Sequence, residues 1–182
     1  MDAFALRADG YLLKPVTEED VHKELNFILE KRAIPSPESK HCIRIQCFGN
    51  FEVFADEEPI RFARSKTKEL LAYLVDREGA TVSMGELMAV LWEDAPESRS
   101  TRSNVRNIIH DLKATLAAHG ADEVLTKSRN AIALNRSMVD CDFYDFLQRM
   151  PYAVNLYHGE YMNQYSWAEI TAAHLIRQES TW

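Results

Sequence analysis

A chain of 182 residues is long enough for one or two small domains with hydrophobic cores. Its hydrophobic content of 46% and charged content of 27% are ordinary for a soluble protein, and no apolar run approaches the roughly 20 residues that span a bilayer. Summed over the whole chain, the net charge of −7 argues against a protein that binds nucleic acid. DNA responds to the local field, so the distribution of charge along the chain is the more useful quantity.

The N-terminus and the cysteines bear on the cellular compartment. Residues 1–10 lack the basic and apolar zones of a secretion signal. The three cysteines form no CxxC pair and are odd in number, which favours free thiols in a reducing cytosol: Cys42, Cys47 and Cys141. A metal site would need further ligands nearby, and only His41 adjoins a cysteine. We therefore expect a cytoplasmic protein without a bound metal or other cofactor.

Residues 1–40 predict a strand, a helix and a linker. The segment 10–14 is typical of a short buried strand, and Thr17 followed by acidic residues is typical of a helix start. The helix is expected to end near Arg32, with an apolar face formed by Val21, Leu25, Ile28 and Leu29. The segment 33–40 contains two prolines and two serines and is predicted to be a linker.

Residues 41–62 predict a small antiparallel sheet. Apolar and polar residues alternate over 43–47, and the alternation resumes over 51–54 after a turn at Gly49-Asn50. A second turn over 56–59 is expected to lead into a third short strand at 60–62.

Three helices are predicted next. The first covers 65–77 and is closed by Glu78-Gly79. The second starts after Ser83, where Glu86 completes the pattern of a capping box. The third runs from about Arg99 to His119, and its predicted buried face holds Val105, Ile108, Ile109, Leu112 and Leu116.

A hairpin and further helices are predicted after the third helix. The segments 124–127 and 131–134 flank a polar tip, which is the pattern of a β-hairpin. A helix is expected to start at Asp140 or Asp142, followed by helices over 153–157 and 167–176 that are rich in aromatic residues.

The third helix carries the clearest functional pattern. Between residues 98 and 136 there are seven basic and three acidic residues, a local net charge of +4 in an acidic chain. The helix face opposite the predicted core presents Arg102, Ser103, Arg106, Asn107, His110 and Lys113. Arginine can pair with guanine, asparagine with adenine and lysine with phosphate, and Arg99 lies at the helix end whose N–H groups favour phosphate. We predict that this helix enters the major groove of DNA, with Lys127 and Arg129 of the hairpin gripping the flanking backbone or minor groove.

Other interpretations of these residues compete with DNA binding. Basic residues on a helix are often only a solvated face, and Asp111 is expected to point sideways or to pair with a base of the same helix. The pairs His110-Asp111 and His158-Gly-Glu160 lack the nucleophile, metal spacing or glycine loop of an active site, so no enzyme is predicted. The alternative function is a protein-protein interaction module that acts through the aromatic C-terminal helices.

The stretch 41–147 resembles the OmpR-type winged-helix domain, in the version found in the Streptomyces antibiotic regulatory protein family and related response regulators. The order and spacing of five segments carry the resemblance: IRIQCFGNFEVF (43–54), RSKTKELLAYLVDREG (64–79), ELMAVLW (86–92), NVRNIIHDLKATL (104–116) and DCDFYDFL (140–147). The chain departs from the family in the wing, where Asn130-Ala131 replaces the usual Gly-Tyr.

Two further segments extend the resemblance. GYLLKPV (10–16), with the helix after it, resembles the end of a receiver domain of a two-component response regulator. This resemblance implies that Lys14 matches the lysine that contacts the phosphoaspartate, although the chain contains no region with the phosphoacceptor. LYHGEYMNQYSWAE (156–169) resembles the opening of the bacterial transcriptional activator domain. We therefore expect a fragment, or the product of a late start codon.

The expected fold is α+β: a winged helix-turn-helix with an N-terminal antiparallel sheet and a C-terminal wing hairpin, flanked by a β-α receiver remnant and C-terminal helices. The expected divisions are a receiver remnant (1–32), a linker (33–40), a winged-helix DNA-binding domain (41–139) and the start of a helical activator domain (140–182). The expected function is sequence-specific regulation of transcription, as the output part of a two-component phosphorelay. The resemblance implies double-stranded DNA, RNA polymerase and a sensor histidine kinase as partners, and we predict a homodimer through residues 10–32.

Overall fold

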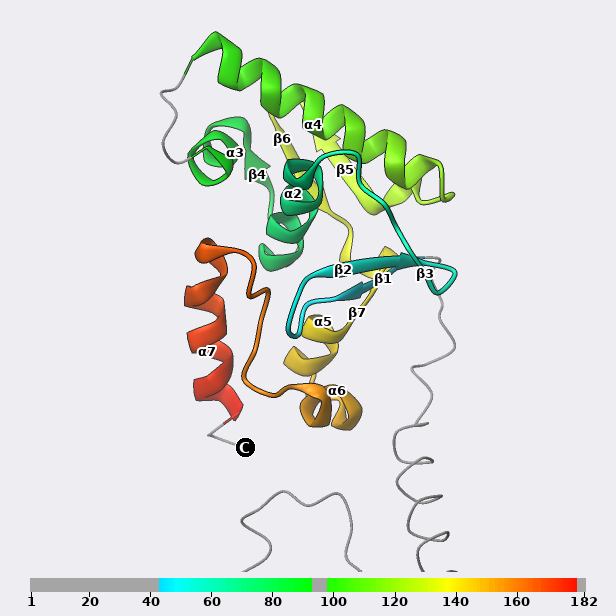
Figure 1. Ribbon diagram of the computed structural model, residues 1–182, viewed down its shortest axis with the longest axis vertical. Coiled ribbons are helices and arrows are strands. Elements are labelled where there is room, and N and C mark those ends of the chain that lie inside the picture. Colours follow the sequence, from blue (N-terminus) through cyan, green and yellow to red (C-terminus); the bar gives the residue numbers. More distant parts are fainter. Residues whose placement is uncertain (1–42, 93–97, 180–182) are drawn as a thin grey trace, which may run out of the picture. The chain divides into compact units, whose positions relative to one another are not determined.

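The computed structural model describes residues 43–92 and 98–179 (Figure 1). The chain divides into two units, 1–38 and 39–182, and all the described residues belong to the second. The strand predicted at 10–14, the helix predicted over 17–32, Lys14 and the predicted linker lie outside the described residues. The described part is a mixed α+β fold with two sheets and six α-helices.

The first sheet has the strand order β3-β2-β1-β7. Strands β1 (Ile43–Gln46) and β2 (Glu52–Ala55) are antiparallel and alternate between buried and partly buried residues, as their sequence predicts. The third strand, β3 (Glu58–Pro59), comes earlier than the predicted 60–62, which was wrong. The reason is the tight turn at Asp56 and Glu57, where two residues with φ of 48° and 66° reverse the chain and match the twist of the strands.

Strand β7 (Asp140–Cys141) completes this sheet and was not predicted. It pairs in parallel with β1, so Cys141 lies opposite Ile45 although the two are far apart in sequence. A strand of two residues has no periodicity to detect, and its partner is chosen by the tertiary fold.

Three helices follow the first sheet: α2 (Ser65–Asp76), α3 (Met84–Leu91) and α4 (Arg99–Ala117). Helix α2 ends at Asp76, and the positive φ values of Glu78 and Gly79 close the chain after it as predicted. The Ser83 hydroxyl caps α3 by accepting the Glu86 backbone N–H at 3.2 Å. The Glu86 carboxylate accepts the Tyr73 hydroxyl at 2.7 Å, so it links α3 to α2.

The second sheet has the strand order β4-β6-β5 and contains the predicted hairpin. After the short 3-10 helix η2 (Asp122–Val124), strand β5 (Leu125–Ser128) turns through residues 129–130 into β6 (Ala131–Leu134). Strand β4 (Val82–Ser83), which was not predicted, pairs with β6. The hairpin is therefore joined to the start of α3 through a shared sheet.

The C-terminal segment continues the same unit through the predicted boundary at residues 139 and 140. Its elements are η3 (Arg136–Met138), α5 (Asp142–Leu147), α6 (Pro151–Leu156), η4 (Ser166–Ala168) and α7 (Glu169–Glu179). The loop before η4 forms a β-bridge from Tyr161 to Phe48 beside the first sheet. The Tyr161 hydroxyl also donates to Asp76 of α2 at 3.0 Å.

Several aromatic residues of this segment pack inward. Tyr157 and Tyr161 are 0% and 2% exposed. Trp167 meets the Tyr73 ring edge-on, with centroids 5.2 Å apart, and stacks on Tyr165.

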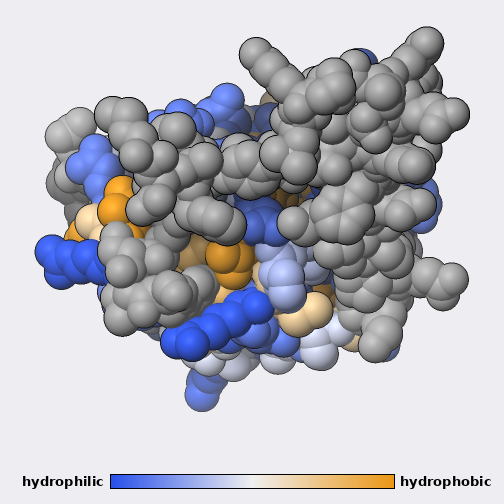
Figure 2. Space-filling model, turned by 90° about the horizontal axis from the view of Figure 1, so that it is seen from below, coloured by the Kyte–Doolittle hydropathy of each residue, from blue (hydrophilic) through white to orange (hydrophobic). Residues whose placement is uncertain are grey.

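The large apolar side chains that are exposed in the described part are Met150, Leu156, Ile170 and Ile176. Apolar surface is visible among hydrophilic residues from below (Figure 2). None of the described helices is long and apolar enough to cross a membrane.

Candidate nucleic-acid interface

The start of α4 is fixed by a side-chain cap. The Ser98 hydroxyl accepts the backbone N–H of Thr101 at 3.1 Å, and the two hydroxyl oxygens are 2.9 Å apart. Serine is among the preferred residues for this position because it satisfies an N–H group that has no partner within the helix. Arg99 is therefore the first helical residue, as the sequence predicts.

The apolar face of α4 is anchored against α2 and α3. Each member of the predicted core face is at most 4% exposed: Val105, Ile108, Ile109, Leu112 and Leu116. This confirms the predicted face and fixes the rotation of the helix about its own axis. The side chains on the other side of α4 must then point away from the core.

All seven predicted α4 residues lie on the side of α4 away from the core: Arg99, Arg102, Ser103, Arg106, Asn107, His110 and Lys113. Six of them are exposed, and Lys113 is half-buried. At about 100° per residue, Arg106 and His110 fall near the middle of this face and Lys113 falls on one flank. Arg99, Arg106 and Lys113 form no ion pair within the described part of the chain, so their charges can meet an external anion.

The two predicted hairpin cations lie on a different element. Lys127 is near the end of β5, and Arg129 begins the two-residue turn that follows it. Both are exposed, and no hydrogen bond or ion pair joins either to α4 among the described residues. The fold thus presents two separate basic elements, a helix face and a hairpin tip.

Two arrangements were expected for Asp111, and the ion pair within its own helix is not the one seen. Its carboxylate Oδ2 lies 3.0 Å from Nη1 of Arg64, which is the residue just before α2, and among the described residues no ion pair joins it to a base of α4. Sequence reasoning missed Arg64 because nothing in a local pattern shows which distant side chain reaches a helix flank. A basic residue directly before a helix that packs on α4 is the one hint that the sequence contains.

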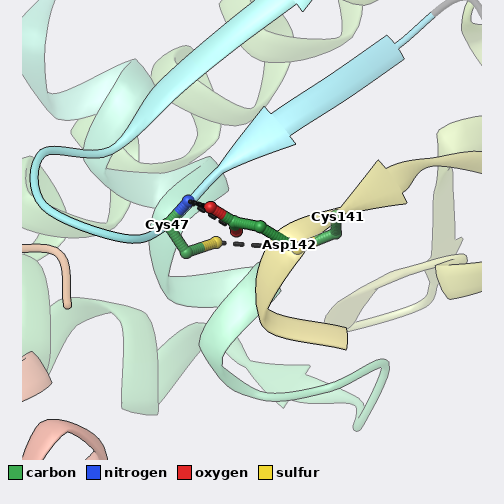
Figure 3. A group of neighbouring side chains, drawn as sticks. All are labelled: Cys47, Cys141 and Asp142. Carbon is green, nitrogen blue, oxygen red and sulfur yellow. Dashed lines mark hydrogen bonds between the residues drawn. The ribbon is translucent and has the colours of Figure 1, made fainter. Parts of the chain in front are cut away.

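A second group that the sequence did not reveal lies where β1 meets α5 (Figure 3). The sulfurs of Cys47 and Cys141 are 3.6 Å apart, and the Asp142 carboxylate lies beside them. Asp142 accepts backbone N–H bonds from Cys47 at 2.8 Å, Phe48 at 3.1 Å and Phe143 at 2.7 Å. These bonds tie the end of β1 to the start of α5.

The chemistry of this group favours a structural role. Burial raises the pKa of the Cys47 thiol well above its ordinary value, which disfavours the reactive thiolate. Burial also raises the pKa of Asp142 to about 6, although three backbone N–H donors favour its charged form. Two sulfurs and a carboxylate within 4.8 Å are donors that a zinc ion accepts. Among the described residues these three ligands leave a tetrahedral site incomplete, and the carboxylate already accepts three backbone N–H bonds.

Comparison with known proteins gives a likeness of fold. No protein-family model matches the chain, and no curated protein matches it. A solved structure with a similar fold is that of Mycobacterium tuberculosis EmbR in complex with a low-affinity phosphopeptide, with a TM-score of 0.63 and 18% sequence identity. The match covers 78% of this chain and 44% of the EmbR chain, so the chain spans less than half of the length of that protein. At this identity the likeness supports the mixed α+β architecture and assigns no residue a role.

Proposed function

We propose that this chain is a sequence-specific DNA-binding regulator of transcription and not an enzyme. The observation that carries the proposal is the outer face of α4, where arginine, asparagine, histidine and lysine side chains gather opposite a fully buried apolar face. An α-helix fits the major groove, and these side chains include the donors that distinguish base edges there. A helix face that is only solvated needs polar residues of any kind, and not arginine, asparagine and lysine in particular.

The elements around α4 support the same function. Helices α2 and α3 pack against the buried face of α4, as the first helices of a helix-turn-helix support the recognition helix. The β5–β6 hairpin presents Lys127 and Arg129, which suit the DNA backbone or the minor groove. We therefore propose the winged helix-turn-helix that the sequence resemblance implies, with α4 as its recognition helix and the hairpin as its wing.

The regulatory setting follows from the sequence resemblance. In our proposal the chain is the output part of a cytoplasmic two-component phosphorelay, with a sensor histidine kinase upstream and RNA polymerase downstream. The segments on which this depends, including Lys14, lie outside the described residues.

The proposal of a homodimer through 10–32 has a direct test. Light scattering should give the mass of two chains at high concentration, and a single-chain mass there would contradict it.

Selection of binding sites in vitro, followed by gel-shift titration, tests the DNA-binding function. The chain should enrich a defined duplex, and its binding should weaken steeply with salt, by about 0.9 log units per log unit of salt for each phosphate contact. Arg106→Ala should reduce binding to the selected site by about 1–3 kcal/mol and relax base preference at one position. Arg177→Ala, which removes the same charge from α7, should leave binding unchanged. Enrichment of no sequence would refute sequence-specific binding.

A further inference from the structure

An acidic residue on a DNA-reading helix needs an explanation. Asp111 is 29% exposed and lies on α4, one turn after Asn107. An uncompensated carboxylate there would repel the phosphate backbone. The structure compensates it with Arg64, whose guanidinium is held 3.0 Å away and whose side chain remains 55% exposed.

The position of this ion pair on α4 is specific. Asn104, Asn107 and Asp111 follow one another at spacings of three and four residues, which places them in one row along the helix. At about 100° per residue, this row is on the flank opposite Lys113. Within the row the helix itself supplies amides and an acid but no cation. Arg64 reaches this flank from the residue before α2.

We propose that Arg64 belongs to the DNA-binding surface, where it offsets the charge of Asp111 and donates to a backbone phosphate beside the Asn107 flank of α4. The inference rests on the proposed function of α4. Arginine suits this role because its planar guanidinium carries five N–H donors. The Asp111 contact engages Nη1, and more than half of the side chain stays open to a second, anionic partner.

Two substitutions break the same ion pair and separate this role from a merely structural one. Arg64→Ala removes the phosphate contact and exposes Asp111, so the affinity for the selected duplex should fall about tenfold. The slope of log affinity against log salt should become shallower by about 0.9. Asp111→Asn removes the acid and releases Arg64, so affinity should rise by roughly threefold with no loss of slope. A structural pair would give both variants the same sign.

Controls distinguish charge, folding and function. Arg136→Ala also removes a cation from an exposed ion pair, the one with Glu78. This pair lies at the other end of α2, which is about 18 Å long. It should leave the salt slope unchanged. Urea unfolding of each variant shows whether the fold is retained, and Asp111→Asn provides the test if Arg64→Ala does not fold.

The outcomes are distinct. Opposite effects of Arg64→Ala and Asp111→Asn on affinity, with the slope changed only by the first, support the proposal. If the parent binds DNA and both variants weaken it alike or leave it unaltered, the inference on Arg64 fails and the proposed function stands. If the parent chain retards no DNA, the proposed function fails and the inference falls with it.

Discussion

Asp142 accepts three backbone N–H bonds from two elements while it is enclosed by protein, and burial raises its pKa to about 6. The unfolded chain has an aspartate pKa near 3.9. Because the folded pKa is the higher one, folding favours the protonated form. Its stabilising contribution is fully present below about pH 4 and is lost as the pH rises through 6.

The expected result is a fall in the free energy of unfolding of about 2 kcal/mol between pH 4 and pH 7 that depends on this one carboxyl. Urea unfolding across this range should show the fall in the parent chain and a flatter profile in Asp142→Asn, whose side chain does not titrate. The difference between the two profiles isolates Asp142, since Asp76 and Asp145 also have raised pKa values. Parallel profiles would show that Asp142 has an ordinary pKa.

At the scale of single elements, the beginning of α4 depends on one hydroxyl. Ser98→Ala removes the acceptor for the Thr101 N–H and should lower the free energy of unfolding by about 1 kcal/mol. The first turn holds Arg99 and Arg102, so DNA affinity should fall as well. Ser98→Asn keeps a capping acceptor and should preserve both quantities in thermal unfolding and gel-shift titration. Equal stability of the alanine and asparagine variants would contradict the cap.

Elements with long periodic patterns were predictable, and very short ones were not. Helix α4 spans 19 residues, and its buried face follows from helical spacing alone. Strands β4 and β7 have two residues each and exist because β6 and β1 lie beside them. The shift of the third strand to Glu58 reflects turn geometry. Positive φ is usually predicted from glycine or asparagine, and neither occurs at positions 56 and 57, where the chain has Asp56 and Glu57.

The candidate site divides in the same way. The outward residues of α4 could be predicted because the apolar face fixes the rotation of the helix, and the remaining positions then face away from the core. The Arg64–Asp111 pair and the junction of Cys47 with Asp142 depend on contacts between distant segments. The Glu86 carboxylate likewise meets Tyr73 of a neighbouring helix. No local spacing encodes which distant partner a side chain meets.

At the scale of the whole molecule, the C-terminal segment completes the core of the helices before it. Tyr157 packs against Phe48 and Phe146, with both ring centroids 4.9 Å away, and Trp167 covers Tyr73. A chain that ends at residue 147 should lose at least about 3 kcal/mol of stability, because the fully buried side chains of Tyr157 and Tyr161 disappear and their partners become exposed. Thermal unfolding and light scattering should show a lower midpoint and association. An unchanged midpoint would mean that residues 148–182 are dispensable for the fold.

The parallel pairing of β1 with β7 has a consequence for how the protein is made. Ribosomes deliver β1 first, and its partner at residues 140–141 arrives nearly a hundred residues later. Until then one edge of β1 carries unpaired backbone groups, the kind of edge to which other chains can add a strand. Closing so long a loop is also slow compared with forming the helices in between. The edge of β1 in the nascent chain is therefore open to pairing with other chains until Asp140 and Cys141 have left the exit tunnel.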